Sequence, residues 1–181
     1  EKHCGFVAFI GEPNAGKSTL LNHMVGSKIS IVTHKVQTTR SRIRGVSING
    51  TSQIVFVDTP GLFKPRRRLD RAMVKSAWSE ALEADIIVFL VEANKGLTEG
   101  VKYNLEKLQG SSTSAISIIL AINKIDRVKS QILLKLTEEL YEEYQFEETF
   151  FISATKLLFS INEISASNQS NLSSLEGIHH S

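Results

Sequence analysis

Short apolar runs alternate along the chain with stretches whose apolar residues recur every three or four positions. The runs are nearly continuous, as in strands that are buried on both faces of a sheet. They cover residues 5–10, 86–91, 116–122 and 149–152. Helices are expected at residues 17–25, 69–82, 99–108 and 130–144. This alternation predicts an α/β fold, in which a mostly parallel sheet carries helices on both faces.

Residues 43–57 have the pattern of a β-hairpin. Residues 43–48 alternate as a half-exposed strand does, and residues 53–57 are an apolar returning strand. Asn49-Gly50 stands between them, and this dipeptide favours the tight turns that join antiparallel strands. The expected sheet therefore has six strands, with one antiparallel strand at an edge.

The last part of the chain departs from this pattern. Residues 160–181 contain seven Ser and three Asn but only two charged residues, Glu163 and Glu176. We expect one domain over residues 1–156, followed by a polar tail over residues 157–181. A weak or partial last helix is expected over residues 157–164.

Composition excludes several classes of protein. The chain has 181 residues, of which 41% are apolar and 22% charged, so it can bury a full core and is not disordered throughout. No run approaches the length of a membrane span, and no apolar leader is visible. The single cysteine, Cys4, excludes a disulfide framework and a multi-cysteine zinc site, and we expect it to be buried.

Charge is distributed unevenly, although the net charge is only +2. Residues 1–75 hold 13 Lys and Arg against 4 Asp and Glu, whereas residues 76–181 hold 8 against 15. Residues 35–75 alone carry ten basic side chains. Such a block can bind a polyanion, although charge by itself equally describes a solvated surface.

Residues 11–18 match the phosphate-binding pattern G-x-x-x-x-G-K-S/T, between a predicted strand and a predicted helix. The glycines let successive N–H groups converge on phosphate oxygens, and the helix N-terminus adds positive potential. We expect Lys17 to contact the terminal phosphates and the Ser18 hydroxyl to bind Mg²⁺. The predicted phosphate-loop contacts are Glu12, Pro13, Asn14, Ala15, Gly16, Lys17, Ser18 and Thr19.

Three further motifs follow predicted strands. Asp58, in the segment Asp58, Thr59, Pro60 and Gly61, can hold Mg²⁺ through water, and the Gly61 N–H can meet a γ-phosphate. The segment with Asn123, Lys124 and Asp126 offers a carboxylate that can accept both N–H donors of guanine, which adenine lacks. The backbone of Ser153, Ala154 and Thr155 is placed to cover the guanine O6.

These motifs together resemble the translation-factor-like P-loop GTPases, and in particular the Era family of bacterial GTPases. The resemblance covers about residues 5–156. The segments that carry it are GEPNAGKSTLLN (11–22), VQTTR (36–40), DTPGLF (58–63), NKID (123–126) and ISAT (152–155). It implies a cytoplasmic switch that binds GTP, GDP and Mg²⁺, hydrolyses GTP slowly and acts in assembly of the small ribosomal subunit on 16S rRNA. Peripheral association with the inner membrane stays open.

The resemblance also assigns roles by position. Thr39 is the threonine expected to reach Mg²⁺ and the γ-phosphate, with Thr38 as the alternative. The implied catalytic set is Lys17, Thr39 and Gly61, and the implied metal set is Ser18, Thr39 and Asp58. In potassium-stimulated relatives, an Asn at the position of Asn14 binds K⁺. The alternative role for Asn14 is a local bond that stabilises the loop.

Leu62 stands where many small GTPases carry a catalytic Gln, so intrinsic turnover is expected to be slow. The arginines at positions 40, 42 and 66–68 are candidates for an arginine finger, although we favour a solvent- or partner-facing role.

The chain departs from the family after Lys156. The family carries a C-terminal KH domain that binds RNA through a G-x-x-G loop, and no such loop follows Ser160. We expect a GTPase domain without that module. Two other hypotheses stay open, namely a nucleotide-dependent binding module with negligible hydrolysis and a fragment that does not fold stably.

Overall fold

A computed structural model describes residues 3–26, 43–65, 67–110, 116–154 and 158–162. The strands are β1 (His3–Gly11), β2 (Ile43–Asn49), β3 (Ser52–Asp58), β4 (Ile86–Glu92), β5 (Ser117–Asn123), β6 (Glu148–Ser153) and β7 (Leu158–Asn162). The helices are α1 (Lys17–Gly26), α2 (Arg68–Ala81), α3 (Glu99–Gln109), α4 (Ser130–Glu143) and the 3₁₀ turn η1 (Ile125–Arg127). The helices and strands predicted between residues 5 and 152 are all present, with ends displaced by at most two residues.

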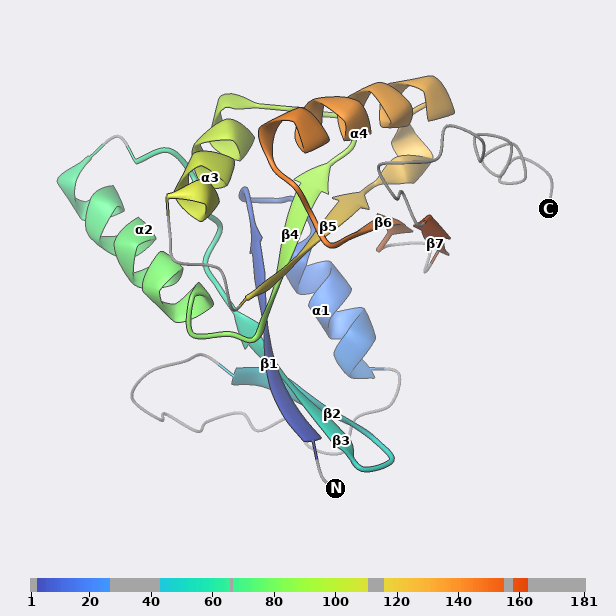
Figure 1. Cartoon of the computed structure of the whole chain (residues 1–181). Coiled ribbons are helices and arrows are strands. Elements are labelled where there is room, and N and C mark those ends of the chain that lie inside the picture. Colours follow the sequence, from blue (N-terminus) through green and yellow to red (C-terminus); the bar gives the residue numbers. More distant parts are fainter. Residues whose placement is uncertain (1–2, 27–42, 66, 111–115, 155–157, 163–181) are drawn as a thin grey trace.

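The strands form one sheet in the order β2-β3-β1-β4-β5-β6-β7 (Figure 1). Strands β3, β1, β4, β5 and β6 are parallel to their neighbours, and β2 pairs antiparallel with β3 as the turn at Gly50 predicts. Strand order reverses on either side of β1, and ligands of such sheets bind at the carboxyl ends of the strands beside this reversal. The confirmed prediction is a mostly parallel, P-loop type α/β sheet.

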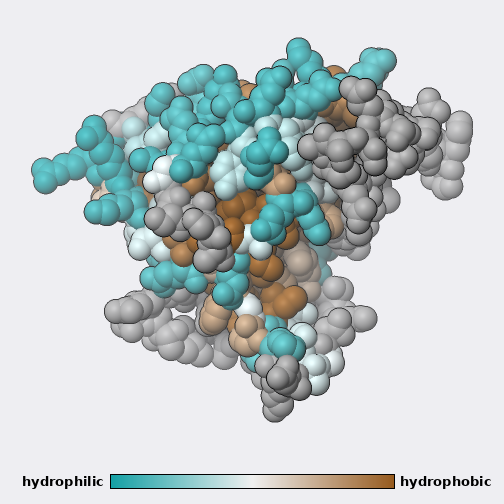
Figure 2. Space-filling view, in the orientation of Figure 1, coloured by the Kyte–Doolittle hydropathy of each residue, from teal (hydrophilic) through white to brown (hydrophobic). Residues whose placement is uncertain are grey.

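The two faces of the sheet bury separate apolar clusters. One cluster joins the sheet to α2, α3 and α4, and it includes Trp78, Leu105 and Leu136. The other joins the sheet to α1 and includes Phe9 and Leu21. Hydrophilic residues cover much of the outer surface where α2 and α4 lie (Figure 2). Each helix therefore turns an apolar stripe to the sheet and a polar face outward.

The seventh strand corrects the sequence prediction of a weak helix over residues 157–164 and of a sheet with six strands. β7 pairs antiparallel with β6, from Ser153 opposite Leu158 to Thr149 opposite Asn162. Residues 158–162 read L-F-S-I-N, and this alternation has the period of a strand. Because β6 would otherwise expose its outer row of N–H and C=O groups, pairing with β7 satisfies them.

Cys4 is a second correction, because it is exposed rather than buried. β1 begins at His3, earlier than the apolar run indicates, and its first residues are exposed whereas Val7 to Gly11 are buried. No helix in the described part of the chain is long and apolar enough to cross a bilayer.

Candidate functional site

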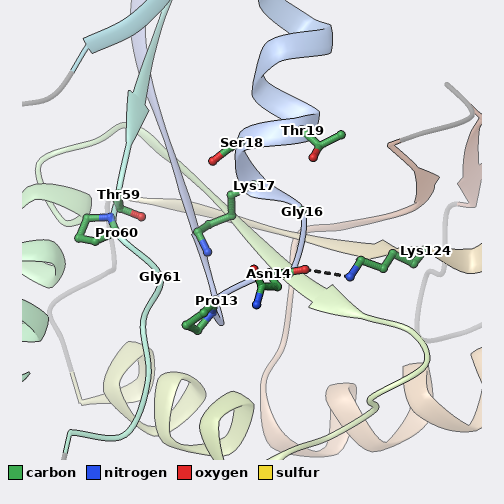
Figure 3. A pocket seen from close by; sticks show the side chains of 10 residues that line it. All are labelled: Pro13, Asn14, Gly16, Lys17, Ser18, Thr19, Thr59, Pro60, Gly61 and Lys124. Carbon is green, nitrogen blue, oxygen red and sulfur yellow. Dashed lines mark hydrogen bonds between the residues drawn. The ribbon is translucent and has the colours of Figure 1, made fainter.

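A cavity of about 420 Å³ opens at the carboxyl edge of the sheet. Its lining comes from three separate segments: the phosphate loop with the start of α1, the turn after β3, and the residue after β5. The lining residues are Pro13, Asn14, Gly16, Lys17, Ser18, Thr19, Thr59, Pro60, Gly61 and Lys124, which Figure 3 shows around one space. The fold thus brings three of the predicted motifs together.

The phosphate loop depends on two residues with positive φ, Asn14 at 66° and Gly16 at 104°. The Ala15 N–H donates to the Glu12 carbonyl at 3.2 Å, which closes the turn. α1 begins immediately afterwards at Lys17, so its N-terminal N–H groups and positive dipole end face the cavity. This arrangement suits the binding of an anion.

Lys17 is buried, with 7% of its surface exposed. Its ammonium donates to the carbonyls of Gly11 at 2.9 Å and Glu12 at 2.8 Å. These acceptors hold the charge at the cavity wall. Neutral carbonyls can be exchanged for the charged oxygens of a phosphate, which make stronger hydrogen bonds.

The turn after β3 packs directly against the phosphate loop. The Leu62 N–H donates to the Gly11 carbonyl at 2.9 Å, and a Cβ on Gly61 would lie 2.9 Å from the Pro13 nitrogen. Leu62 is fully buried, and its carbonyl accepts a 3.3 Å hydrogen bond from Asn104 of α3. A core side chain at position 62 cannot orient an attacking water.

Asn123 connects three motifs through one buried amide. Its Nδ2 donates to the Ala15 carbonyl at 2.8 Å, and its Oδ1 accepts from the N–H groups of Lys124 at 2.8 Å and Ala154 at 3.1 Å. The predicted connection between Asn123 and the phosphate loop is confirmed. The Ala154 N–H has Asn123 as its acceptor here, and its contact with a guanine O6 stays a prediction.

Lys124 is held by the phosphate loop and by β4. Its Nζ donates to the Asn14 carbonyl at 2.9 Å (Figure 3) and lies 2.9 Å from Glu92 Oε2. Lys95 lies 3.1 Å from the same carboxylate oxygen. Burial opposes ionisation of Glu92, but hydrogen bonds and charge from Lys124 and Lys95 outweigh it and lower the pKa of the Glu92 carboxyl.

Replacing Glu92 with Gln is expected to lower the free energy of unfolding by about 1–3 kcal/mol at pH 7. Because the pKa of Glu92 is lowered in the folded state, its contribution is complete above the ordinary value of 4.5 and disappears as the pH falls through the folded pKa. Urea unfolding at pH 7 and at decreasing pH measures both effects. The exposed Glu142, changed to Gln, is the control. A pH-independent difference between wild type and Glu92→Gln would contradict the ion-pair explanation.

Asp126 lies in η1, immediately beyond Lys124. Ser153 Oγ donates to Asp126 Oδ1 at 2.7 Å, so the last motif orients the carboxylate of the one before it. Lys124 itself has a φ of 63°, a left-handed conformation that turns the chain sharply between Asn123 and Asp126. The predicted guanine-binding motif and the Ser153 motif are therefore adjacent in space.

Several predicted site residues lie away from the cavity or outside the described residues. Thr39 and Thr155 fall outside the described residues, as do Thr38 and the arginines at 40, 42 and 66. The backbone of Asp58 pairs with Phe9 at the end of β3. The side chain of Glu12 accepts a 2.8 Å hydrogen bond from Thr98, the N-cap residue of α3, and does not line the cavity.

The sequence analysis did not identify three residues that support the site, namely Glu92, Thr98 and Asn104. Glu92 had a usable signal, because an acid ends an otherwise apolar strand, just as Asp58 does. Thr98 has the signature of a helix N-cap, since its hydroxyl accepts from the Val101 N–H at 3.1 Å. Nothing in the sequence indicates that the same hydroxyl donates to Glu12, 86 residues away.

Residues 6–124 match the model of a protein family described as 50S ribosome-binding GTPase. This match covers more than half of the chain, and the chain belongs to that GTPase family. Relatives include GTPase Era of Dinoroseobacter shibae, 66% identical over 152 residues, and GTPase Era of Agrobacterium fabrum, 55% identical over 151. The two alignments cover 84% and 83% of this chain but 49% and 47% of those proteins. The resemblance to the Era family is confirmed, and the chain spans about half the length of the curated relatives it matches.

Solved structures of Era have the same fold. Era in complex with MgGDPNP and nucleotides 1506–1542 of 16S ribosomal RNA is 36% identical, with a TM-score of 0.68 over 86% of this chain and 53% of that one. An Aquifex aeolicus Era variant bound to GDP·AlF4⁻ is 37% identical, with a TM-score of 0.66 over 85% and 52%. The architecture of the described residues is thus that of the Era GTPase fold.

Proposed function

We propose that this chain is the guanine-nucleotide-binding and GTP-hydrolysing part of an Era-type switch. The observation that carries the proposal is that the phosphate loop, the turn after β3 and Lys124 all line one cavity. Family membership and Era structures with GDPNP and GDP·AlF4⁻ support the same assignment.

Guanine selectivity is assigned to Asp126. A carboxylate accepts from both guanine N1–H and the 2-amino group, whereas adenine leaves it without donors. Ser153 holds one carboxylate oxygen at 2.7 Å, which fixes its direction. The stem of Lys124, fixed at its ammonium by Asn14 and Glu92, is available to lie against the base.

Mg²⁺ suits the donors present at the phosphate end. The Ser18 side chain is exposed in the cavity, and a hydroxyl is a hard oxygen ligand. Among the described residues, no group of three or more His, Cys, Asp or Glu side chains could hold a metal ion. The proposed ligands are therefore Ser18, Asp58, Thr39 and phosphate oxygens. When bound, Mg²⁺ neutralises charge on the β- and γ-phosphates. Lys17 and the α1 N-terminus supply further positive charge, and the Gly61 N–H is assigned to the γ-phosphate.

Slow hydrolysis follows from the buried side chain of Leu62, which leaves that position without a group to orient water. Positioning and charge stabilisation remain, and these provide much of the catalysis in phosphoryl transfer. The same observation favours the second candidate, a binding module whose own hydrolysis is negligible.

Thermal unfolding with nucleotides, followed by single-turnover hydrolysis of γ-³²P-GTP, tests the proposal. We expect GDP with Mg²⁺ to raise the unfolding midpoint and ADP to leave it unchanged. Release of phosphate within the lifetime of the complex supports the enzyme, and binding without release selects the binding module. A midpoint that no guanine nucleotide raises would overturn both. The absence of a cooperative transition would select the unstable fragment.

We also propose that the basic start of α2 faces RNA on the ribosomal small subunit, because basic side chains gather there and an Era protein of the same fold forms a complex with a 16S rRNA fragment. Arg67 and Arg68 are exposed there. Changing Arg66, Arg67 and Arg68 together to Ala should lower the salt dependence of small-subunit binding by up to about one unit of slope per lost phosphate contact. Binding is measured between low and high KCl. An unchanged slope would show that these side chains lie on a solvated surface and do not contact RNA.

Potassium is the remaining cofactor proposal, and Asn14 is its ligand. Asn14 lines the cavity, but its φ of 66° also gives it a conformational role, because Asn adopts left-handed backbone more readily than most residues. We expect faster GTP turnover in K⁺ than in Na⁺ at equal ionic strength. Asn14→Gly keeps the backbone freedom and removes the amide, so it should abolish the difference while GDP still binds. Equal wild-type rates in both salts would leave Asn14 with the conformational role alone.

A further inference from the structure

The side chain of Glu12 lies against α3 instead of the cavity. Its Oε2 accepts a 2.8 Å hydrogen bond from Thr98 Oγ1, which joins the second residue of the phosphate loop to the N-cap of α3. Thr98 also caps the helix, since its hydroxyl accepts from the Val101 N–H. Figure 3 shows this helix, in yellow-green, below Pro13. The phosphate loop and α3 are therefore connected through one hydroxyl.

Gly100 provides the space that the Glu12 carboxylate occupies. A Cβ at position 100 would lie 2.0 Å from Oε1 of Glu12 and 2.8 Å from its Cδ. Gly100 is buried in the first turn of α3, where Gly is less favourable than Ala for helix formation. The carboxylate gives this glycine a packing reason, because any side chain there would displace it.

The backbone of Glu12 is part of the phosphate-binding machinery. Its carbonyl accepts from Lys17 Nζ at 2.8 Å and from the Ala15 N–H at 3.2 Å. Holding the Glu12 side chain on α3 restrains the backbone that carries this carbonyl. The position of the Lys17 ammonium then depends on contacts made outside the cavity.

The charge of Glu12 gives its position a second consequence. A carboxylate in a phosphate-binding loop repels the phosphates of a nucleotide if it turns toward them. Thr98 and Gly100 hold it on the opposite side of the loop. Loss of this arrangement would both loosen Lys17 and bring a negative charge closer to the ligand.

We propose that Glu12 is a positioning residue, and that Thr98 and Gly100 form its seat on α3 and thereby set how slowly a guanosine di- or triphosphate is released. This inference rests on the proposed function, because it requires nucleotide in the cavity. It assigns to α3 a role in nucleotide retention that the motifs of the loop do not show.

Release of N-methylanthraniloyl-GDP, chased with excess GDP and followed by fluorescence, tests the inference. In Gly100→Ala the obstructing atom meets the end of a flexible side chain, so the fold should be kept while Glu12 moves. We expect release about fivefold faster than in wild type. Gly110→Ala at the other end of α3 is the matched control, because its Cβ would lie at an ordinary 3.4 Å from the Glu106 carbonyl. Its release rate should equal that of wild type.

A double-variant comparison separates positioning from general damage. Glu12→Ala removes the contact with Thr98, so it should speed release of the probe. The effect should be smaller than that of Gly100→Ala, because no carboxylate is left to repel the phosphates. The change Gly100→Ala should then have no further effect, and the double variant should release the probe more slowly than Gly100→Ala alone. Thr98→Ser keeps the hydroxyl and should behave as wild type. Thermal unfolding of each variant without nucleotide should show midpoints no lower than that of Gly110→Ala.

Two results would overturn the inference while leaving the proposed function intact. In the first, the wild-type protein binds the probe, and Gly100→Ala and Gly110→Ala release it at the same rate. The other is additive effects of the changes at positions 12 and 100. Failure of the wild-type protein to bind the probe at all would instead overturn the proposed function, and the inference with it.

Discussion

Replacing Gly16 with Ala is expected to weaken nucleotide binding by about 100-fold or more. A Cβ at position 16 would lie 2.1 Å from Nδ2 of Asn123, and the φ of +104° is strained for any residue with a side chain. Asn123 would have to leave its hydrogen bonds to Ala15 and Ala154, which hold the phosphate loop to the ends of β5 and β6. Isothermal titration with GDP and Mg²⁺ measures the loss.

Gly50→Ala is the control for backbone strain. Gly50 has a φ of +59°, but a Cβ there meets nothing within 4 Å. This variant should lose some stability in the hairpin and keep its affinity for GDP. If the two alanine variants bound GDP equally well, Asn123 would not have the connecting role that its contacts indicate.

Changing Asp126 to Asn is expected to weaken GTP binding by at least about 100-fold and to improve binding of xanthosine triphosphate. The amide keeps one acceptor but replaces the other oxygen with a donor, which opposes the 2-amino group of guanine and matches the carbonyl of xanthine. Competition of GTP, XTP and ATP against a fluorescent nucleotide measures the preference.

Ser153→Ala is the matched control for this change. It removes the 2.7 Å hydrogen bond to Asp126 while leaving the carboxylate in place. We expect weaker GTP binding, by about fivefold, with no gain for xanthine. Equal binding of ATP and GTP by the wild-type protein would contradict the assignment of Asp126 to the base.

The helices and most strands were predictable because their signals are local. Ile86 to Val91 is apolar on both faces, and the Asn49-Gly50 turn determines the direction of the hairpin. β7 is not predicted because its five residues precede a long polar stretch, although its partner β6 comes directly before it in the sequence. The exposure of Cys4 is not predicted either, because burial at the end of a strand depends on which helices reach it.

The site was predictable as far as its motifs are continuous in sequence. Residues 11–18 and 123–126 each carry their own spacing, and parallel strands bring their ends to one edge. The contacts of Glu92 with Lys124 and of Glu12 with Thr98 link residues 32 and 86 positions apart. Such pairs depend on helix placement and side-chain direction, which a single sequence does not specify.

The central position of β1 has a consequence for the order in which the protein can fold as it is synthesised. β1 leaves the ribosome before the other described strands, yet its neighbours in the sheet are β3 and β4. The amide that holds its loop belongs to Asn123, 108 residues beyond Ala15. Contacts between residues so far apart in the sequence slow folding and form only late in synthesis. A nascent chain is therefore expected to retain nucleotide only after β5 has emerged. The phosphate loop is complete at Ser18, but it becomes functional only when most of the described strands have been synthesised.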